Sequence, residues 1–68
     1  MDDKALRVAV DQFLKHVQFS AQREIEKVIR NAISSGKLKG NESITTGVTL
    51  SSAMIDLNLT IYSKIELQ

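Results

Sequence analysis

The sequence predicts an α+β fold, in which a helical hairpin is followed by an antiparallel β-hairpin in the order α-α-β-β. Residues 1–40 are rich in helix formers and repeat their apolar side chains at helical spacing, whereas residues 41–68 alternate apolar and polar side chains. The charge also changes at this boundary, from eight basic and five acidic side chains before it to one basic and three acidic after it. At 68 residues the chain is expected to be one small domain, residues 1–68.

The composition excludes several classes of function. Hydrophobic residues make up 43% and charged residues 25%, a globular balance, and the net charge of +1 favours no polyanionic partner. There is no cysteine and only one histidine, so disulfides, thiolate metal sites and multi-histidine sites within one chain are excluded. We therefore expect no metal and no cofactor.

The same sequence gives no sign of a membrane or of secretion. No apolar run approaches the roughly 18 residues of a membrane helix. The first residues lack the basic segment followed by an apolar segment that marks a secretory signal. We expect a cytoplasmic protein that does not bind a membrane.

The first helix is expected over residues 3–17. One side of it carries a continuous apolar stripe, and Asp2 and Asp3 stand where a carboxylate caps free N–H groups and opposes the helix dipole. The stripe consists of Leu6, Ala9, Val10, Phe13, Leu14 and Val17.

The second helix is expected over residues 21–35, with Ser20 as its N-cap and Gly36 as the residue that ends it. Its broad apolar side consists of Ile25, Val28, Ile29, Ala32 and Ile33. Residues 18–20 then form a short turn, which makes the two helices a hairpin. Phe19 precedes the expected cap and can pack onto the second helix.

Two strands follow the loop over residues 37–43. The first is expected over residues 45–52, with a turn near residues 52–54. In the last stretch every apolar side chain occupies an odd position, as only a strand can place them on one face. These residues are Ile55, Leu57, Leu59, Ile61, Ile65 and Leu67, and polar Ser63 interrupts the alternation, which predicts a bulge or a local break in the strand.

The last strand is long for a two-stranded sheet and leaves an unpaired edge. Pairing of this edge between two copies hides it and enlarges the sheet, so we expect a homodimer whose sheet continues across the subunits. The alternative is a monomer in which the strand is shorter and its end frays.

Residues 20–43 resemble a family of small uncharacterised bacterial proteins of about this length, which share a QREIE…A…G-LKG-E pattern. The resemblance implies helix-then-strand order and brings no assigned activity. The matching residues are Gln22, Arg23, Glu24, Ile25, Glu26, Ala32, Gly36, Leu38, Lys39, Gly40 and Glu42, and Phe13, Leu14 and Lys15 also fit.

A basic face is the feature that most favours a ligand. Its residues are Arg23, Lys27, Arg30, Lys37 and Lys39, the first three on one side of the second helix. Such a line can follow phosphates, in a helix-turn-helix or otherwise. Glu24 and Glu26 flank it, however, and can pair with Lys27 and Arg30, so a solvated face explains it as well.

For function, the sequence favours a non-enzymatic protein-interaction module of unknown partner that also binds itself. The candidate contacts are Thr60, Tyr62 and Lys64, with Thr46 and Asn58, on the polar face of the hairpin. Weak nucleic-acid binding through the basic face is the alternative. No carboxylate, serine or histidine stands in a pattern typical of catalysis, so an enzyme is not expected.

Overall fold

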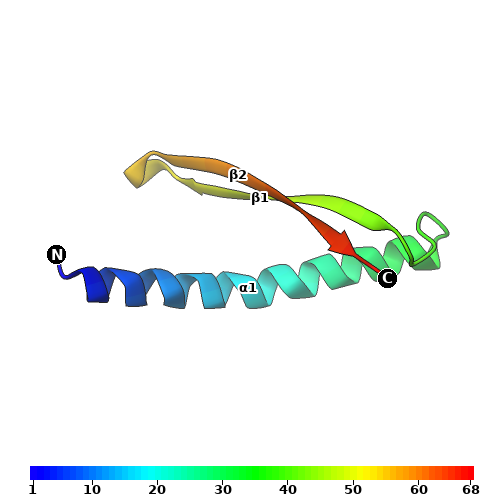
Figure 1. The fold of residues 1–68 in the computed structure, drawn as a ribbon, viewed down its shortest axis with the longest axis horizontal. Helices are drawn as coiled ribbons and strands as arrows, with labels where there is room; N and C mark the ends of the chain where they lie inside the picture. Colours follow the sequence, from blue (N-terminus) through cyan, green and yellow to red (C-terminus); the bar gives the residue numbers. More distant parts are fainter. The chain divides into compact units, whose positions relative to one another are not determined.

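The protein is described by a computed structural model that covers residues 1–68. It divides into two compact units, Met1–Lys37 and Leu38–Gln68. The first unit contains one helix, α1, and the second contains two antiparallel strands, β1 and β2 (Figure 1). The α+β class is therefore confirmed, as is the β-hairpin.

Helix α1 runs without a break over Asp3–Ser34. Its N-cap is Asp2, whose side chain accepts a hydrogen bond of 3.1 Å from the backbone N–H of Lys4. Its end follows from Gly36, which adopts a φ of 83°, a left-handed conformation that glycine adopts at little cost. Both predicted ends of the helical region are confirmed to within a residue or two.

The predicted helical hairpin is wrong, because residues 18–20 are helical (Figure 1). This segment contains no glycine or proline, and Ser20 lies inside the helix instead of capping it. Val17 and Ala21 are four residues apart, so the apolar side of the first half passes directly into that of the second. A turn would have broken this stripe.

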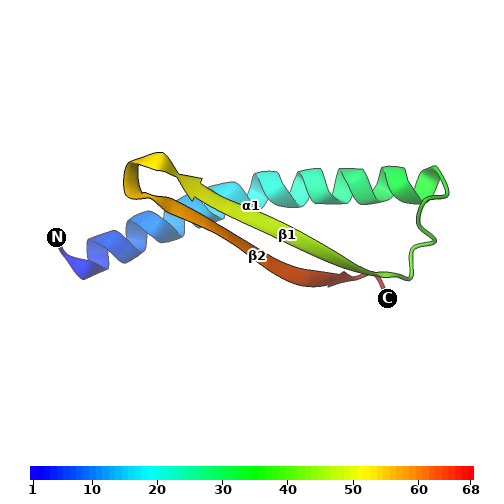
Figure 2. The same cartoon turned by 90° about the horizontal axis from the view of Figure 1, so that it is seen from above.

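The hairpin consists of β1 (Ser43–Ser52) and β2 (Leu57–Glu66), which lie side by side along their whole lengths (Figure 2). A single 3-10 turn, η1 (Ala53–Ile55), connects them. Asp56 closes the turn with a φ of 52° and a ψ of 36°, and aspartate tolerates this left-handed conformation better than most residues. The turn thus lies slightly later than predicted and needs no glycine.

The register of the hairpin places the apolar residues of both strands on one face. Directly opposite residues share a face, and the opposed pairs there are Ile44–Ile65, Thr46–Ser63, Val48–Ile61, Leu50–Leu59 and Ser52–Leu57. Ser63 pairs regularly with Thr46, so the predicted bulge is wrong. Thr46 lies on the apolar face and not, as predicted, on the polar face with Thr60 and Tyr62.

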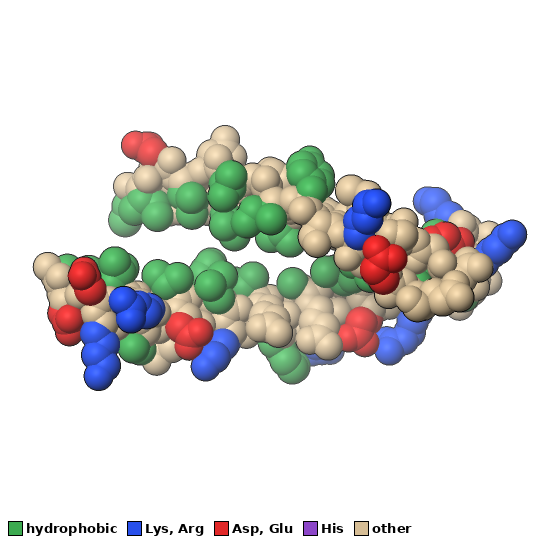
Figure 3. Space-filling view, in the orientation of Figure 1, with side chains coloured by type: hydrophobic (Ala, Val, Ile, Leu, Met, Phe, Trp, Pro, Cys, Tyr) green, Lys and Arg blue, Asp and Glu red, His purple; other side chains and the backbone are tan.

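No residue of the chain is buried, apolar or polar. A single helix has no second layer within its own unit, and a two-stranded sheet has none on its apolar face. The space-filling view shows apolar side chains along both the helix and the hairpin (Figure 3). Each unit by itself therefore presents its hydrophobic residues as surfaces.

Candidate interaction surfaces

The longest surface is the apolar stripe of α1. Its residues are Leu6, Val10, Leu14, Val17, Ala21, Ile25, Val28 and Ala32, at successive intervals of four, four and three residues. Leu6, Val17 and Val28 are thus eleven residues apart, and an eleven-residue repeat stays close to the 3.6-residue period of a helix. The stripe therefore follows one side of α1 almost from end to end.

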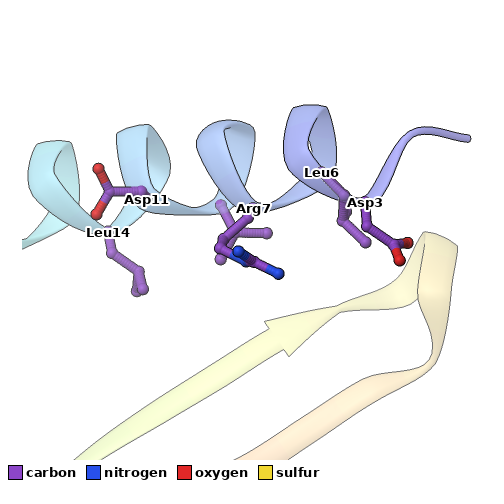
Figure 4. A pocket seen from close by; sticks show the side chains of 6 residues that line it. Asp3, Leu6, Arg7, Asp11 and Leu14 are labelled. Atoms are coloured by element: carbon purple, nitrogen blue, oxygen red, sulfur yellow. The ribbon is translucent and has the colours of Figure 1, made fainter.

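At the start of α1 the stripe forms a shallow depression. Its lining consists of two rows with four-residue spacing, one apolar and one charged, from consecutive helical turns (Figure 4). The apolar row is Leu6, Val10 and Leu14, and the charged row is Asp3, Arg7 and Asp11. The mixture suits an apolar contact with a polar margin, as at a protein interface.

Three of the five residues of the predicted basic face share one side of α1. Helical spacing brings Arg23, Lys27 and Arg30 to one side of α1. Lys37 follows the end of the helix, and Lys39 lies in the second unit. A second shallow depression there is lined by Ser20, Arg23, Glu24 and Lys27.

Two of the three helical cations have partners. Arg30 donates to Glu26 at 3.1 Å, as predicted, and the guanidinium of Arg23 lies 5.8 Å from the centre of the Phe19 ring. Phe19 therefore takes part in a cation–π contact and does not pack against an N-cap. The structure contains no ion pair between Glu24 and Lys27, and the helix-turn-helix interpretation is wrong because α1 has no turn.

Part of the QREIE segment in α1 belongs to a row of hydrogen-bonded side chains on the helix surface. Gln22 donates to Glu26 at 3.0 Å, and Glu26 also accepts from Arg30, so three residues at four-residue spacing are linked. Ile25 belongs to the apolar stripe. These residues of the QREIE segment thus have structural roles on the helix surface.

The loop before β1 is organised by one carboxylate. Glu42 accepts hydrogen bonds from the backbone N–H groups of Lys39 at 2.8 Å, Gly40 at 2.9 Å and Asn41 at 3.2 Å. Bonds from Lys39 and Gly40 are the main reason that the pKa of Glu42 lies below its ordinary value. Gly40 has a φ of 106°, which glycine accommodates. Sequence reasoning missed this role, because it depends on how the loop folds around the carboxylate.

The polar face of the hairpin brings together the predicted protein-contact residues. Thr60, Tyr62 and Lys64 occupy alternate positions of β2 and therefore share that face. Thr60 and Thr49 exchange a hydrogen bond of 3.0 Å across the strands. Tyr62 lies opposite Gly47 and is 70% exposed.

An exposed apolar turn is a surface that the sequence did not indicate. Met54 and Ile55, at the end of the hairpin, are 95% and 69% exposed. Ile55 was expected within the strand, but it lies in η1, where the alternation of the strand does not apply. An isolated exposed apolar residue is ordinary, yet two adjacent ones add to the apolar surface of this unit.

No group of three or more His, Cys, Asp or Glu side chains is arranged to hold a metal ion. No helix combines the length and apolarity needed to cross a bilayer. The surfaces that the fold does build are the apolar stripe, the apolar face of the hairpin and the free edges of its two strands.

Comparison with known proteins gives one match. A search of the curated proteins and a search of the solved structures each found nothing similar. A family model described as "Family of unknown function (DUF6494)" matches residues 1–68, the whole chain. The match covers α1, the Glu42 loop and both strands. The chain therefore belongs to the DUF6494 family.

Proposed function

We propose that the chain is a non-enzymatic protein-interaction module that works as a homodimer. The observation that carries the proposal is that neither unit, taken by itself, buries any residue, in a chain that is 43% hydrophobic. Leu14 on α1 is 48% exposed, and Leu59 and Ile61 on β2 are 50% and 52% exposed. Each such side chain is worth about 1.5–3 kcal/mol when fully buried.

The size of the two units supports assembly. A lone two-stranded hairpin is marginal in water, and a single helix of ordinary sequence gains most of its stability from packing its apolar side. Chains of this length commonly need oligomerisation to enlarge the core. A second copy doubles the apolar surface available for burial without any other component.

The placement of the ionisable groups supports a role other than catalysis. On α1 the pairs Asp11–Lys15 and Glu26–Arg30 are exposed ion pairs, each with a distance of 3.1 Å. The carboxylate of Glu42 is engaged by three backbone N–H groups. These groups are committed to local structure and do not converge on one site.

Sedimentation equilibrium and native mass spectrometry of the full chain test the proposal. We expect a species of two chain masses at micromolar concentration, with mixed helix and strand content by circular dichroism. A folded species of one chain mass over the whole concentration range would contradict the homodimer.

Arg23 and Lys27 lie on the same side of α1, which supports weak nucleic-acid binding as a second candidate function. Fluorescence anisotropy with labelled duplex DNA, single-stranded DNA and RNA at low and moderate salt tests it. If this candidate is right, the double variant R23Q/K27Q weakens binding more than K4Q/K15Q, which removes the same charge from another part of α1. Equal effects, or no salt-sensitive binding at low salt, would count against it.

A further inference from the structure

The two free edges of the hairpin differ in their exposed backbone groups. The N–H of Leu67 donates to the carbonyl oxygen of Glu42 at 3.0 Å, which continues the register of the strands by one pair. In an antiparallel ladder such hydrogen-bonded pairs alternate with pairs whose N–H and C=O groups point outward. Counting by two from Glu42, the even residues of β1 bond to β2, and its odd residues point to the free edge.

The two edges therefore carry different residues. The outward backbone groups of β1 belong to Ser43, Thr45, Gly47, Thr49 and Ser51. Those of β2 belong to Asn58, Thr60, Tyr62, Lys64 and Glu66. Only the second set contains charges and a large aromatic ring.

Soluble proteins protect a free strand edge with lysine and other charges, proline, or a bulge. Lys64 and Glu66 supply such charges to the edge of β2. The ten residues of β1 include no charge and no proline, and their pairing with β2 is regular throughout. An unprotected edge of this length is suited to pairing with another strand.

We infer that β1 pairs with β1 of a second copy, antiparallel, to give a four-stranded sheet in the order β2-β1-β1-β2. This inference rests on the proposed homodimer and adds the surface through which the dimer forms. The second copy is favoured over a foreign strand because two uncharged Ser- and Thr-rich edges complement each other without any charge to match.

Pairing of two hairpins in this way also widens the apolar face of the sheet. A two-fold axis perpendicular to the sheet keeps the apolar faces of both copies on the same side. Ile44, Val48 and Leu50 of one copy then lie on the same face of the sheet as those of the other. The apolar face becomes four strands wide, enough to stabilise a sheet that two strands alone leave marginal.

Two matched proline variants test the edge. Thr49 and Thr60 lie directly opposite each other and share one side-chain hydrogen bond, and both backbone N–H groups point outward. T49P and T60P therefore remove the same side-chain bond and one outward N–H each, but on different edges. We expect T49P to weaken dimerisation by roughly tenfold or more, and T60P to change it by less than about threefold.

A second measurement does not depend on how well proline is tolerated. The chain has no cysteine, so T49C and T60C each carry a single spin label. Strands are about 4.8 Å apart, so across the sheet the Thr49 labels of a dimer are one spacing apart and the Thr60 labels three spacings, about 14 Å. Thr49 and Thr60 are directly opposite each other. The offset along the strand direction between the two labels of a dimer is therefore the same for both variants. The T49C labels are therefore expected to be the closer pair by dipolar spectroscopy.

The outcomes separate this inference from the proposal on which it rests. A wild-type chain that sediments as a monomer contradicts the homodimer itself. A wild-type dimer in which T60P is the more disruptive variant, or in which the T60C labels are the closer pair, overturns only the β1 edge. A dimer in which the two label pairs are equally far apart also overturns the edge and leaves the homodimer standing.

Discussion

The ring of Tyr62 lies over Gly47 on the neighbouring strand, so closely that a Cβ atom at position 47 would be 2.7 Å from Cε1 of the ring. The two residues are directly opposite in the register, and side chains approach most closely in pairs that are not hydrogen-bonded. The tyrosine thereby covers backbone that a glycine leaves bare, a compensation known for glycine in sheets. Tyr62 thus has a structural role beside any role in binding.

Replacing Gly47 by alanine is expected to move the ring of Tyr62 away from β1. The ring is exposed and can rotate, so the hairpin should remain folded. In the wild type, the α-protons of Gly47 should show a ring-current shift by NMR. That shift should vanish in Y62A, which should also lose about 0.2–1 kcal/mol of hairpin stability, and persist in Y62F. Loss of the shift in Y62F would contradict the contact.

Glu42 is expected to make the loop over residues 39–42 sensitive to acid. Because the pKa of its carboxyl is lower in the folded chain than in the unfolded chain, its contribution to stability is fully present above the ordinary carboxyl pKa. The contribution is lost as the pH falls through the lowered value. The protection factors of the Lys39 and Gly40 amides, which compare the measured exchange rate with the intrinsic rate at the same pH, should fall over that range. In E42Q these protection factors should already be low at neutral pH and should change little with acid, whereas E24Q, on α1, should behave as the wild type.

Val8 and Val10 provide a matched test of the apolar stripe. They are 49% and 48% exposed, but only Val10 belongs to the stripe, and Val8 lies on the other side of α1. V10N should weaken assembly by roughly tenfold or more, because fully burying an aliphatic side chain of this size is worth about 1.5–3 kcal/mol. V8N carries the same helix-propensity cost and should leave the dissociation constant nearly unchanged. Equal effects in sedimentation experiments would argue against burial of the stripe.

The continuous helix can be distinguished from a helical hairpin by one distance. Spin labels at Q12C and K27C are fifteen residues apart in α1, which is about 22 Å along a helix that rises 1.5 Å per residue. Two packed helices with a turn at residues 18–20 would instead bring these positions to within about 10 Å in backbone separation. Dilution with unlabelled chain removes distances between copies.

The outer limits of the elements could be predicted from single residues with strong local preferences. Asp2 marks the start of α1 and Gly36 its end, because a carboxylate caps and a glycine accepts positive φ. The alternation in β2 was equally clear. These signals depend on a few neighbouring residues and are therefore present in the sequence itself.

The errors arose where a weak local signal competed with a longer pattern. Ser20 is a good N-cap but is also tolerated inside a helix, and only the eleven-residue spacing of Leu6, Val17 and Val28 reveals that one stripe crosses it. A polar residue at Ser63 predicts a bulge only when its partner is unknown, and in the register it forms a regular pair with Thr46. The roles of Tyr62 and Glu42 depend on contacts across the sheet and within a loop, which spacing alone does not specify.

The opposed pair Thr46 and Ser63 has a consequence for whatever covers the apolar face. The two short hydroxyl side chains lie between the larger pairs Ile44–Ile65 and Val48–Ile61. The hydroxyl of Thr46 donates to the carbonyl oxygen of Ile44 at 3.2 Å and needs no further partner. A covering element that packs closely must place a bulky side chain over this short pair or leave a void, so the pair restricts how that element is aligned along the strands.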